Sequence, residues 1–160
     1  MKEKRSVKLL IFCVGLCQLC GLLGAFFTTP AIPGWYASLQ KPAFNPPNAV
    51  FGPVWTILYA LMGAALYLVI RAEGPEALRR KAILLFGVQL ALNTAWSWLF
   101  FGLKNPGLAF ADIVLLWAAI LASSVYFRRL SRPAFWMFLP YLLWVSFAML
   151  LNFEIWRLNS

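Results

Sequence analysis

Five long apolar segments constrain this chain more than any other feature. They cover residues 9–27, 50–70, 82–103, 107–127 and 135–155. A helix needs about 20 apolar residues to cross a hydrocarbon core of about 30 Å, and each segment is of that length. Asp112 and Glu154 are the only charged residues inside them. The sequence therefore predicts an all-α bundle of five transmembrane helices that forms a single integral membrane domain over residues 1–160.

The composition supports a multi-pass membrane protein. Hydrophobic residues make up 62% of the chain and charged residues 12%, whereas a soluble domain is about a quarter charged. The basic start followed by an apolar stretch also fits a cleaved signal peptide. That apolar stretch is long for a signal, so we expect a retained first helix.

Lysine and arginine predict the orientation, because cytoplasmic loops carry an excess of both. One side would hold most of them: Lys2, Lys4, Arg5, Lys8, Arg71, Arg79, Arg80, Lys81, Arg128, Arg129 and Arg132. The other side would hold Lys41, Lys104 and Arg157. We expect the first side to be cytoplasmic in a bacterial cell membrane, with an outer-membrane location as the alternative. The net charge of +9 would attract anionic lipid. Its spread over short loops argues against nucleic-acid binding.

Few residues are suited to metal or redox chemistry. Cys13, Cys17 and Cys20 share one face of the first span, which is compatible with a metal or redox site. At membrane depth such thiols are more often small packing residues. The chain contains no histidine, which removes the commonest haem ligand and general base. We expect no metal and no required cofactor.

The segment 28–49 is the longest polar connection, and five of the ten prolines fall in it. Proline fixes φ and removes a hydrogen-bond donor, so we expect a stiff, largely non-helical loop. Trp35, Tyr36 and Phe44 give this loop aromatic mass. Composition leaves two interpretations open: a lid over the bundle, or an aromatic belt at the membrane interface.

The third span has two different faces at about 100° per residue. One face is polar and aromatic and consists of Gln89, Asn93, Trp96, Ser97 and Phe100. The opposite face carries the small residues Gly87, Ala91 and Ala95, whose spacing allows a second helix to approach closely. We expect the first face to point into the bundle and the second to form a homodimer interface. Ordinary helix packing on both sides is the alternative.

Three other spans carry comparable stripes. The second has Phe51, Trp55 and Tyr59, the fifth has Tyr141, Trp144, Ala148 and Asn152, and the fourth has Asp112. Together these stripes describe an aromatic cavity with a few hydrogen-bonding groups, which suits a flat, apolar ligand. An ordinary packed core is the alternative. Asp112 either serves the cavity or stabilises the first turns of its helix.

Several motifs resemble one known family. They begin with Trp35–Tyr36, Lys41–Pro42 and Asn45–Pro46–Pro47 in the loop and continue with Phe51–Gly–Pro–Val–Trp55, Asn93–Thr–Ala–Trp96–Ser97 and Pro140–Tyr141–Leu–Leu–Trp144, ending at Asn152. The pattern resembles the translocator proteins, also called tryptophan-rich sensory proteins or peripheral benzodiazepine receptors. The resemblance covers nearly the whole chain.

The resemblance implies a five-helix bundle, commonly dimeric, with a ligand pocket capped by the first loop. It implies binding of porphyrins such as protoporphyrin IX and of flat hydrophobic drugs, and in animal relatives of cholesterol. By position, Trp55 and Trp144 resemble the two tryptophans linked in bacterial relatives to light-dependent porphyrin breakdown. Trp35, Tyr59, Asn93, Trp96, Ala148 and Asn152 resemble pocket residues, and Lys41 is suited to pair with a propionate at the mouth.

Three functions follow from this resemblance. The first is a receptor or sensor that binds porphyrin, and the second is light-dependent porphyrin degradation through Trp55 and Trp144. The third is transport of a porphyrin or sterol. Phe153 stands where the family's cholesterol motif has tyrosine, with Arg157 after it, so this chain departs from that motif. We rank the receptor or sensor first, degradation second and transport third. Residues from several helices support a binding pocket, whereas only two tryptophans support turnover.

Overall fold

Helices account for most of the chain in the computed structural model, which describes the backbone of residues 2–160 and side chains from Ser6 onward. Within that part of the chain there is no strand, and five helical segments are long and apolar enough to cross a membrane. The all-α fold with five spans is therefore confirmed. The elements are α1 (Lys2–Ala31), η1 (Ile32–Tyr36), α2 (Asn48–Arg71), α3 (Glu76–Ser97), η2 (Trp98–Gly102), α4 (Pro106–Leu130) and α5 (Arg132–Leu158).

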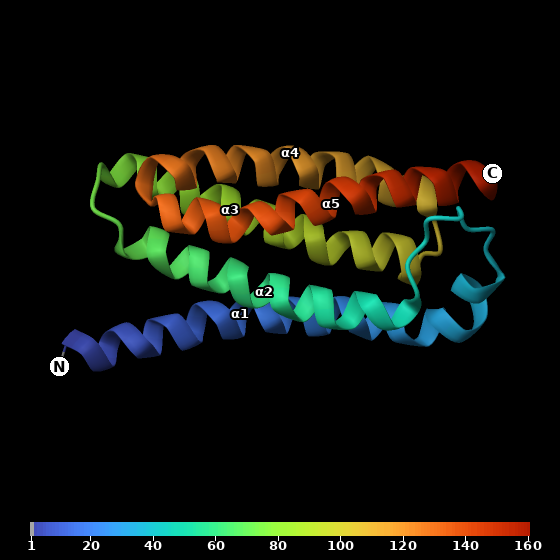
Figure 1. Ribbon diagram of the computed structural model, residues 1–160, viewed down its shortest axis with the longest axis horizontal. Coiled ribbons are helices and arrows are strands. Elements are labelled where there is room, and N and C mark those ends of the chain that lie inside the picture. The colour runs from blue at the N-terminus through green and yellow to red at the C-terminus, as the bar shows by residue number, and fades with distance from the viewer. Residues whose placement is uncertain (1) are drawn as a thin grey trace.

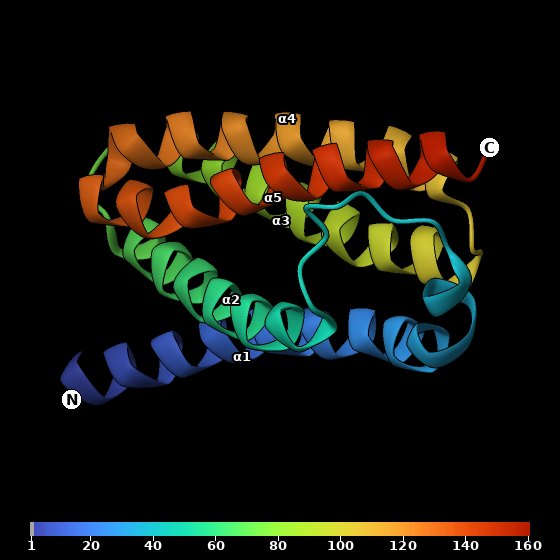
Figure 2. The same cartoon turned by 45° about the vertical axis from the view of Figure 1, so that its right-hand side comes forward.

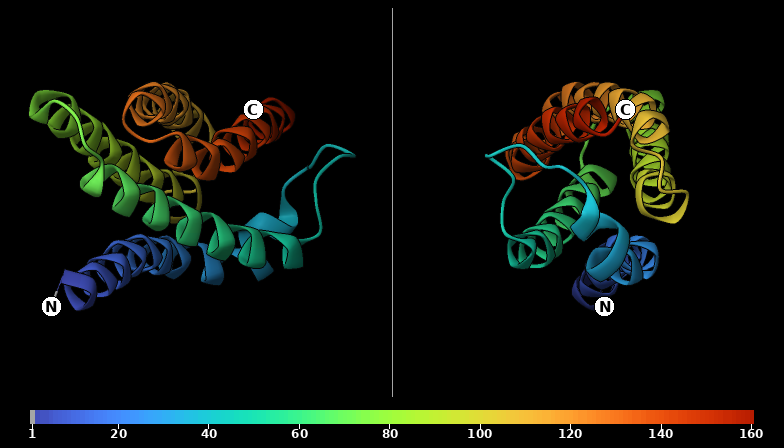
Figure 3. Two further views of the ribbon diagram at one scale, coloured as in Figure 1. Left: turned by 60° about the vertical axis from the view of Figure 1, so that its left-hand side comes forward. Right: turned by 90° about the vertical axis from the view of Figure 1, so that its right-hand side faces the viewer.

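The helices form a ring in the order α1, α2, α5, α4, α3, in which each packs against the next and α3 packs against α1. Figure 3 shows this ring along the bundle axis in its right-hand view. Connections at alternating ends of the bundle join helices that follow one another in the chain (Figure 1). An elongated, closed ring results, and each helix turns one face inward and one face outward.

The two ends of the bundle differ in their connections. The basic end contains the N-terminus, the α2–α3 connection at residues 72–75 and the α4–α5 junction at Ser131. The loop end contains the segment 37–47, the α3–α4 connection at residues 103–105 and the C-terminus (Figures 1 and 2). Among the residues predicted for the basic side, Arg71, Arg79, Arg80, Lys81, Arg128, Arg129 and Arg132 lie at the basic end. The side chains of Lys2, Lys4 and Arg5 lie outside the described residues. The direction in which the bundle crosses the membrane stays a prediction.

The first connection is shorter than the sequence analysis expects. The first helix continues to Ala31 with Pro30 inside it, the π-helical turn η1 follows, and α2 already begins at Asn48. Only residues 39–47 are extended or turn-like. Neither Pro30, inside α1, nor Pro33, near the start of η1, ends this continuous helical segment. The helical extension carries Tyr36 to the loop end, where its side chain is buried.

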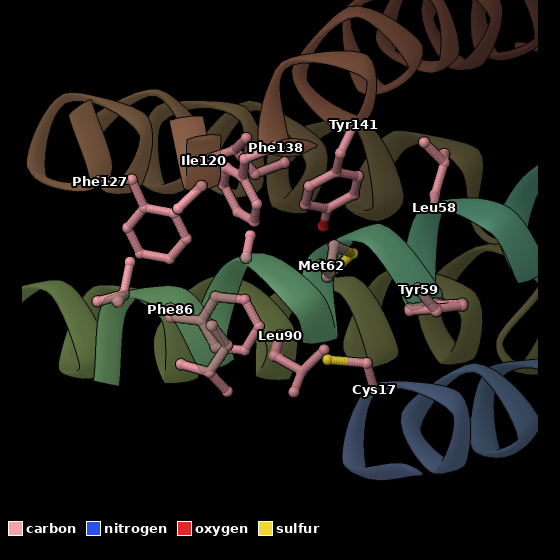
Figure 4. Packing of buried hydrophobic residues seen from close by; sticks show 14 of the residues in the cluster. Cys17, Leu58, Tyr59, Met62, Phe86, Leu90, Ile120, Phe127, Phe138 and Tyr141 are labelled. Atoms are coloured by element: carbon pink, nitrogen blue, oxygen red, sulfur yellow. The ribbon is translucent and has the colours of Figure 1, made fainter. Parts of the chain in front are cut away.

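The half of the bundle nearer the basic end has a solid core. Phe127 and Phe138 have ring centroids 4.9 Å apart, and Phe86 lies 6.1 Å and 6.0 Å from the two. Figure 4 shows these rings with Ile120 and Met62, which close the space between α2, α3, α4 and α5. Each of these side chains is at most 2% exposed. Such close packing leaves no space for a ligand inside the ring of helices in this half.

Glycine sets the contact between α1 and α2. A Cβ atom on Gly63 would lie 2.5 Å from the Cα atom of Val14 and 2.8 Å from the carbonyl oxygen of Cys13. The two backbones therefore touch at this point, which no larger residue would permit. Cys13 and Cys17 are fully buried beside this contact, within the same apolar cluster. Their environment is that of packing residues.

Candidate functional site

A cavity of about 410 Å³ occupies the half of the bundle nearer the loop end. Its wall comes from α1, η1, α2, α3, η2 and α5, and among the described residues it contains no charged side chain. The volume lies within the range of about 300–1,000 Å³ that is usual for small-molecule sites. The cavity is therefore suited to a ligand whose buried part is uncharged.

Ten of the predicted ligand residues lie together on this wall. They come from four helical segments and are Phe51, Trp55, Tyr59, Asn93, Trp96, Ser97, Phe100, Trp144, Ala148 and Asn152. The periodicity of the second, third and fifth spans thus places these residues toward one common space. Binding of a ligand by them stays a prediction.

Aromatic rings make up much of the wall. Trp55 stacks on Tyr59 with ring centroids 5.5 Å apart, and Trp96 stacks on Phe100 at 5.1 Å. Trp144 of α5 contacts Phe51 of α2 edge to face, with ring centroids 6.0 Å apart. These contacts hold the rings in place before any ligand arrives, so a flat apolar molecule would meet preformed ring faces.

A chain of hydrogen bonds runs from the cavity wall into the core. The hydroxyl of Tyr59 donates to Oδ1 of Asn93, and Nδ2 of Asn93 donates to the hydroxyl of Tyr141 at 2.9 Å. The Tyr141 hydroxyl donates in turn to Oε1 of Gln89 at 2.8 Å. All four side chains are buried, and each is hydrogen-bonded through at least one polar atom. Nε2 of Gln89 has no partner among the described residues. The chain lies between the cavity and the solid core and joins α2, α3 and α5.

A second set of hydrogen bonds fixes the wall near the loop end. Nε1 of Trp96 donates to Oδ1 of Asn152 at 2.9 Å, and Nδ2 of Asn152 donates to the carbonyl oxygen of Pro106 at 2.8 Å. The polar groups of both side chains are therefore already used by the protein. In contrast, Nε1 of Trp144 is buried without a hydrogen-bond partner among the described residues. Trp144 therefore brings an indole N–H to the wall that the protein itself does not use.

Five predicted ligand residues do not line the cavity: Trp35, Lys41, Gln89, Asp112 and Tyr141. Gln89 and Tyr141 lie behind the wall in the hydrogen-bond chain, because their stripes continue one turn beyond the cavity. Trp35 packs edge to face on Phe100, with ring centroids 5.6 Å apart, outside the wall.

Lys41 and Asp112 are also separated from the cavity. Nζ of Lys41 donates to the carbonyl oxygen of Leu39 at 3.0 Å and lies 4.7 Å from the ring centroid of Tyr36, which does line the cavity. Lys41 is therefore a neighbour of the wall in the loop. Asp112 is buried on α4 with one carboxylate oxygen unpartnered, and α4 contributes no residue to the cavity wall as described.

The contribution of α1 to the wall was not predicted from the sequence. This helix supplies Gln18, Gly21, Leu22, Gly24, Ala25, Thr28 and Thr29. The available signal was the group of small residues Gly21, Gly24, Ala25 and Thr28, which recur at helical spacing in an otherwise bulky apolar span. Other wall residues missed are Ile32, Tyr36, Asn48, Gly52, Thr56, Phe101, Leu151 and Ile155.

The cavity opens between α1 and α2. The wall residues that are exposed all belong to these two helices: Leu22, Ala25 and Thr29 on α1, and Asn48, Gly52 and Thr56 on α2. The wall residues of α3, η2 and α5 are buried or half-buried. Both helices are long and apolar enough to span a membrane, so the opening lies on the lateral surface of the bundle.

Comparison with known proteins gives a consistent assignment. The profile of the TspO/MBR family matches residues 13–157. The chain is 43% identical to the tryptophan-rich protein TspO of Chlorobaculum tepidum over 97% of this chain and 98% of that protein. It is 40% identical to the translocator protein of Ovis aries over 86% of this chain and 84% of that protein. It is 41% identical to the tryptophan-rich sensory protein of Cereibacter sphaeroides over 78% of this chain and 77% of that protein.

Proposed function

Because this chain belongs to the TspO/MBR family of membrane proteins, we propose that its cavity binds a flat, mostly apolar macrocycle such as protoporphyrin IX, and that the protein acts as a receptor or sensor for it. The observation that carries this proposal is an uncharged cavity whose wall consists largely of preformed aromatic contacts. The names of relatives as sensory and translocator proteins agree with a binding role.

The wall suggests how such a ligand would be held. The faces of Trp55 and Trp96 would stack on the macrocycle, and the free N–H of Trp144 would donate to an acceptor on it. An anionic substituent would stay outside the uncharged cavity, where the cation of Lys41 is available in the loop. The opening between α1 and α2 would admit a ligand dissolved in the bilayer.

The proposal is tested by titrating protoporphyrin IX into detergent-purified protein in the dark while tryptophan fluorescence is recorded. Saturable quenching is expected. Ala148→Trp, which fills the cavity, should remove the saturable component, whereas Leu143→Trp on the outer face of the same helix should keep it. Non-saturable quenching, or equal loss in both variants, would show that the porphyrin does not bind in this cavity.

Light-dependent porphyrin degradation is the second candidate function. It is favoured by the presence of Trp55 and Trp144 on the same cavity wall, where an indole can transfer an electron to a photoexcited macrocycle and dissolved dioxygen can act as the oxidant. Illumination of the complex in air should then cause a protein-dependent loss of porphyrin absorbance. Trp55→Phe with Trp144→Phe should keep dark binding and stop this loss. A stable absorbance in the unmodified protein would leave the receptor function alone.

Transport and sterol binding receive less support. The cavity ends at the hydrogen-bond chain, and beyond it the solid core of Phe86, Phe127 and Phe138 fills the bundle. Arg157 stands at the basic position of the cholesterol motif, from which this chain departs at Phe153. Its guanidinium nitrogen forms an ion pair with a carboxylate oxygen of Glu154 at 2.6 Å. Flux of protoporphyrin IX into sealed vesicles that does not depend on the protein would exclude transport.

A further inference from the structure

A second cavity lies at the basic end, far along the bundle from the aromatic cavity. It is a groove of about 530 Å³ between α4 and α5, next to the Ser131 junction. Its outer part is formed by Arg128, Arg129 and Arg132, and its inner part mainly by aliphatic side chains of both helices. None of its residues lines the aromatic cavity.

The three arginines at the groove have no acidic partner. Among the described residues, none of them takes part in an ion pair or donates a side-chain hydrogen bond, and all three are exposed. The guanidinium of Arg128 lies 5.8 Å from the ring centroid of Phe135, which forms part of the groove. Elsewhere at this end, Arg80 is neutralised by Glu76 at 2.6 Å. The groove therefore presents an uncompensated positive charge at its outer end.

The helix dipoles add little to the attraction of this groove for an anion. The groove lies where α4 ends and α5 begins, so the negative end of one helix dipole and the positive end of the other largely cancel. Two of the arginines stand in the last turn of α4, where they compensate its carbonyl groups. Arg132 has no such role at the start of α5. Attraction for an anion comes from the guanidinium groups, which bind phosphate oxygens well.

The inner part of the groove has the length of one bilayer leaflet. Along α5 it runs from Arg132 through Leu139 to Leu142, a distance of about 15 Å at 1.5 Å per residue. The hydrocarbon core is about 30 Å thick, so one leaflet is about half of that. Leu121 and Val125 form the matching wall on α4. The apolar wall thus begins directly beneath the arginines and extends toward the middle of the membrane.

We propose that this groove binds an anionic phospholipid, whose phosphate contacts the arginines while one acyl chain lies between α4 and α5. Charge complementarity selects a lipid with a net negative headgroup, and the apolar wall selects a lipid over a soluble phosphate. The site is independent of the proposed porphyrin function. It would fasten the basic end of the bundle to one leaflet.

Native mass spectrometry of the full-length protein tests this site with dioleoyl phosphatidylglycerol as the probe. Dioleoyl phosphatidylcholine and glycerol 3-phosphate serve as the neutral-lipid and soluble-phosphate arms. We expect retained phosphatidylglycerol, weaker phosphatidylcholine and no retained glycerol phosphate. Arg128→Gln and Arg132→Gln should each weaken phosphatidylglycerol binding about fivefold, which corresponds to about 1 kcal/mol for a basic residue near an anionic lipid surface.

Matched variants separate the groove from general surface charge. Lys81→Gln removes one positive charge at the same end of the bundle but outside the groove, and it should keep phosphatidylglycerol binding. Val125→Trp fills the apolar part and keeps all three arginines, and it should weaken lipid binding. Equal loss for Lys81→Gln and Arg128→Gln, equal retention of the two lipids, or unchanged binding by Val125→Trp would each overturn the proposal. Circular dichroism confirms that each variant remains folded.

Discussion

The two halves of the bundle share the same five helices but differ in how their interiors are filled. Toward the basic end, Phe86, Phe127 and Phe138 interlock and leave no space. Toward the loop end, aromatic side chains of comparable size line a cavity of about 410 Å³ without filling it. The difference shows that aromatic content does not by itself decide between core and pocket. The wall of the cavity also contains small residues, such as Gly21, Gly24 and Ala148, whose side chains fill little of the interior.

Between the two halves lies the hydrogen-bond chain of Tyr59, Asn93, Tyr141 and Gln89. It uses amide and hydroxyl groups that would be costly to bury unpaired, and it ties three helices together at the floor of the cavity. The cavity can therefore stay open while the bundle around it remains rigid. The packed core lies in one half and the internal cavity in the other.

The largest effect on the free energy of unfolding is expected from shortening a core side chain in the solid half. Phe138→Ala should lower the free energy of unfolding by about 3 kcal/mol or more, because it leaves a cavity where the side chain is fully buried. Phe51→Ala, on the wall of the open half, should cost about 1 kcal/mol, since its side chain already borders empty space. Denaturation in mixed micelles, followed by circular dichroism, measures both. Equal losses would remove the distinction between the two halves.

Breaking the hydrogen-bond chain between the two halves should have an intermediate effect on the free energy of unfolding. Asn93→Leu leaves the hydroxyls of Tyr59 and Tyr141 without their amide partner, and we expect a loss of about 2 kcal/mol in unfolding free energy. Its neighbour Thr94 donates to the carbonyl oxygen of Leu90 in its own helix, so Thr94→Val should cost less than about 1 kcal/mol. The same denaturation measurement applies. A wild-type stability for Asn93→Leu would mean that the chain does not hold the helices together.

The open half can be tested through its access route. A Cβ atom on Gly52 would meet nothing within 4 Å, so Gly52→Trp should fold and obstruct the opening between α1 and α2. We expect protoporphyrin IX to associate roughly tenfold more slowly, a barrier increase of about 1.4 kcal/mol. Stopped-flow tryptophan quenching measures the rate, with Val50→Trp on the outer surface of the same helix as the control. Equal rates for both variants would show that the ligand reaches the cavity elsewhere.

The smallest effect on stability is expected on the outer face of α3. Gly87 and Ala91 are exposed there and Ala95 is half-buried, as a helix–helix interface requires, and homodimerisation through this face stays a prediction. Ala91→Trp should convert a dimer into a monomer while changing the stability of the fold by less than about 0.5 kcal/mol. Light scattering on the purified protein measures the mass, with Leu143→Trp on α5 as the control. An unchanged mass for a dimeric Ala91→Trp protein would place the interface elsewhere.

Periodicity predicted part of the cavity wall well and part of it poorly. On the third span the polar stripe runs through Gln89, Asn93 and Trp96, and the last two line the cavity. A stripe shows which face points inward, but it does not show where along the axis the interior is hollow. For that reason Gln89 and Tyr141 were expected on the wall and lie behind it. Asp112 was also expected there, but its helix, α4, packs between α5 and α3 and contributes no described residue to the cavity wall.

The first helix gave only a weak pattern, the small residues Gly21, Gly24 and Ala25. Its large apolar residues Leu19, Leu22 and Phe26 are exposed on the bundle surface. In water such a helix would be interpreted as buried, but lipid removes the difference between inner and outer faces. Its contribution to the cavity became visible only through its neighbours. Two prolines were likewise misleading, because Pro30 lies inside α1 and Pro33 lies in η1, which continues it.

The sequence by itself determined that this chain forms five membrane-spanning helices and which faces of three of them point inward, because apolar length and helical period are local properties of the chain. Only the tertiary structure decided that the loop-end half is hollow, that α1 closes it and that α4 does not reach it. Those features depend on which small residues meet which rings across the ring of helices. Such meetings join positions far apart in the chain, where local spacing carries no information.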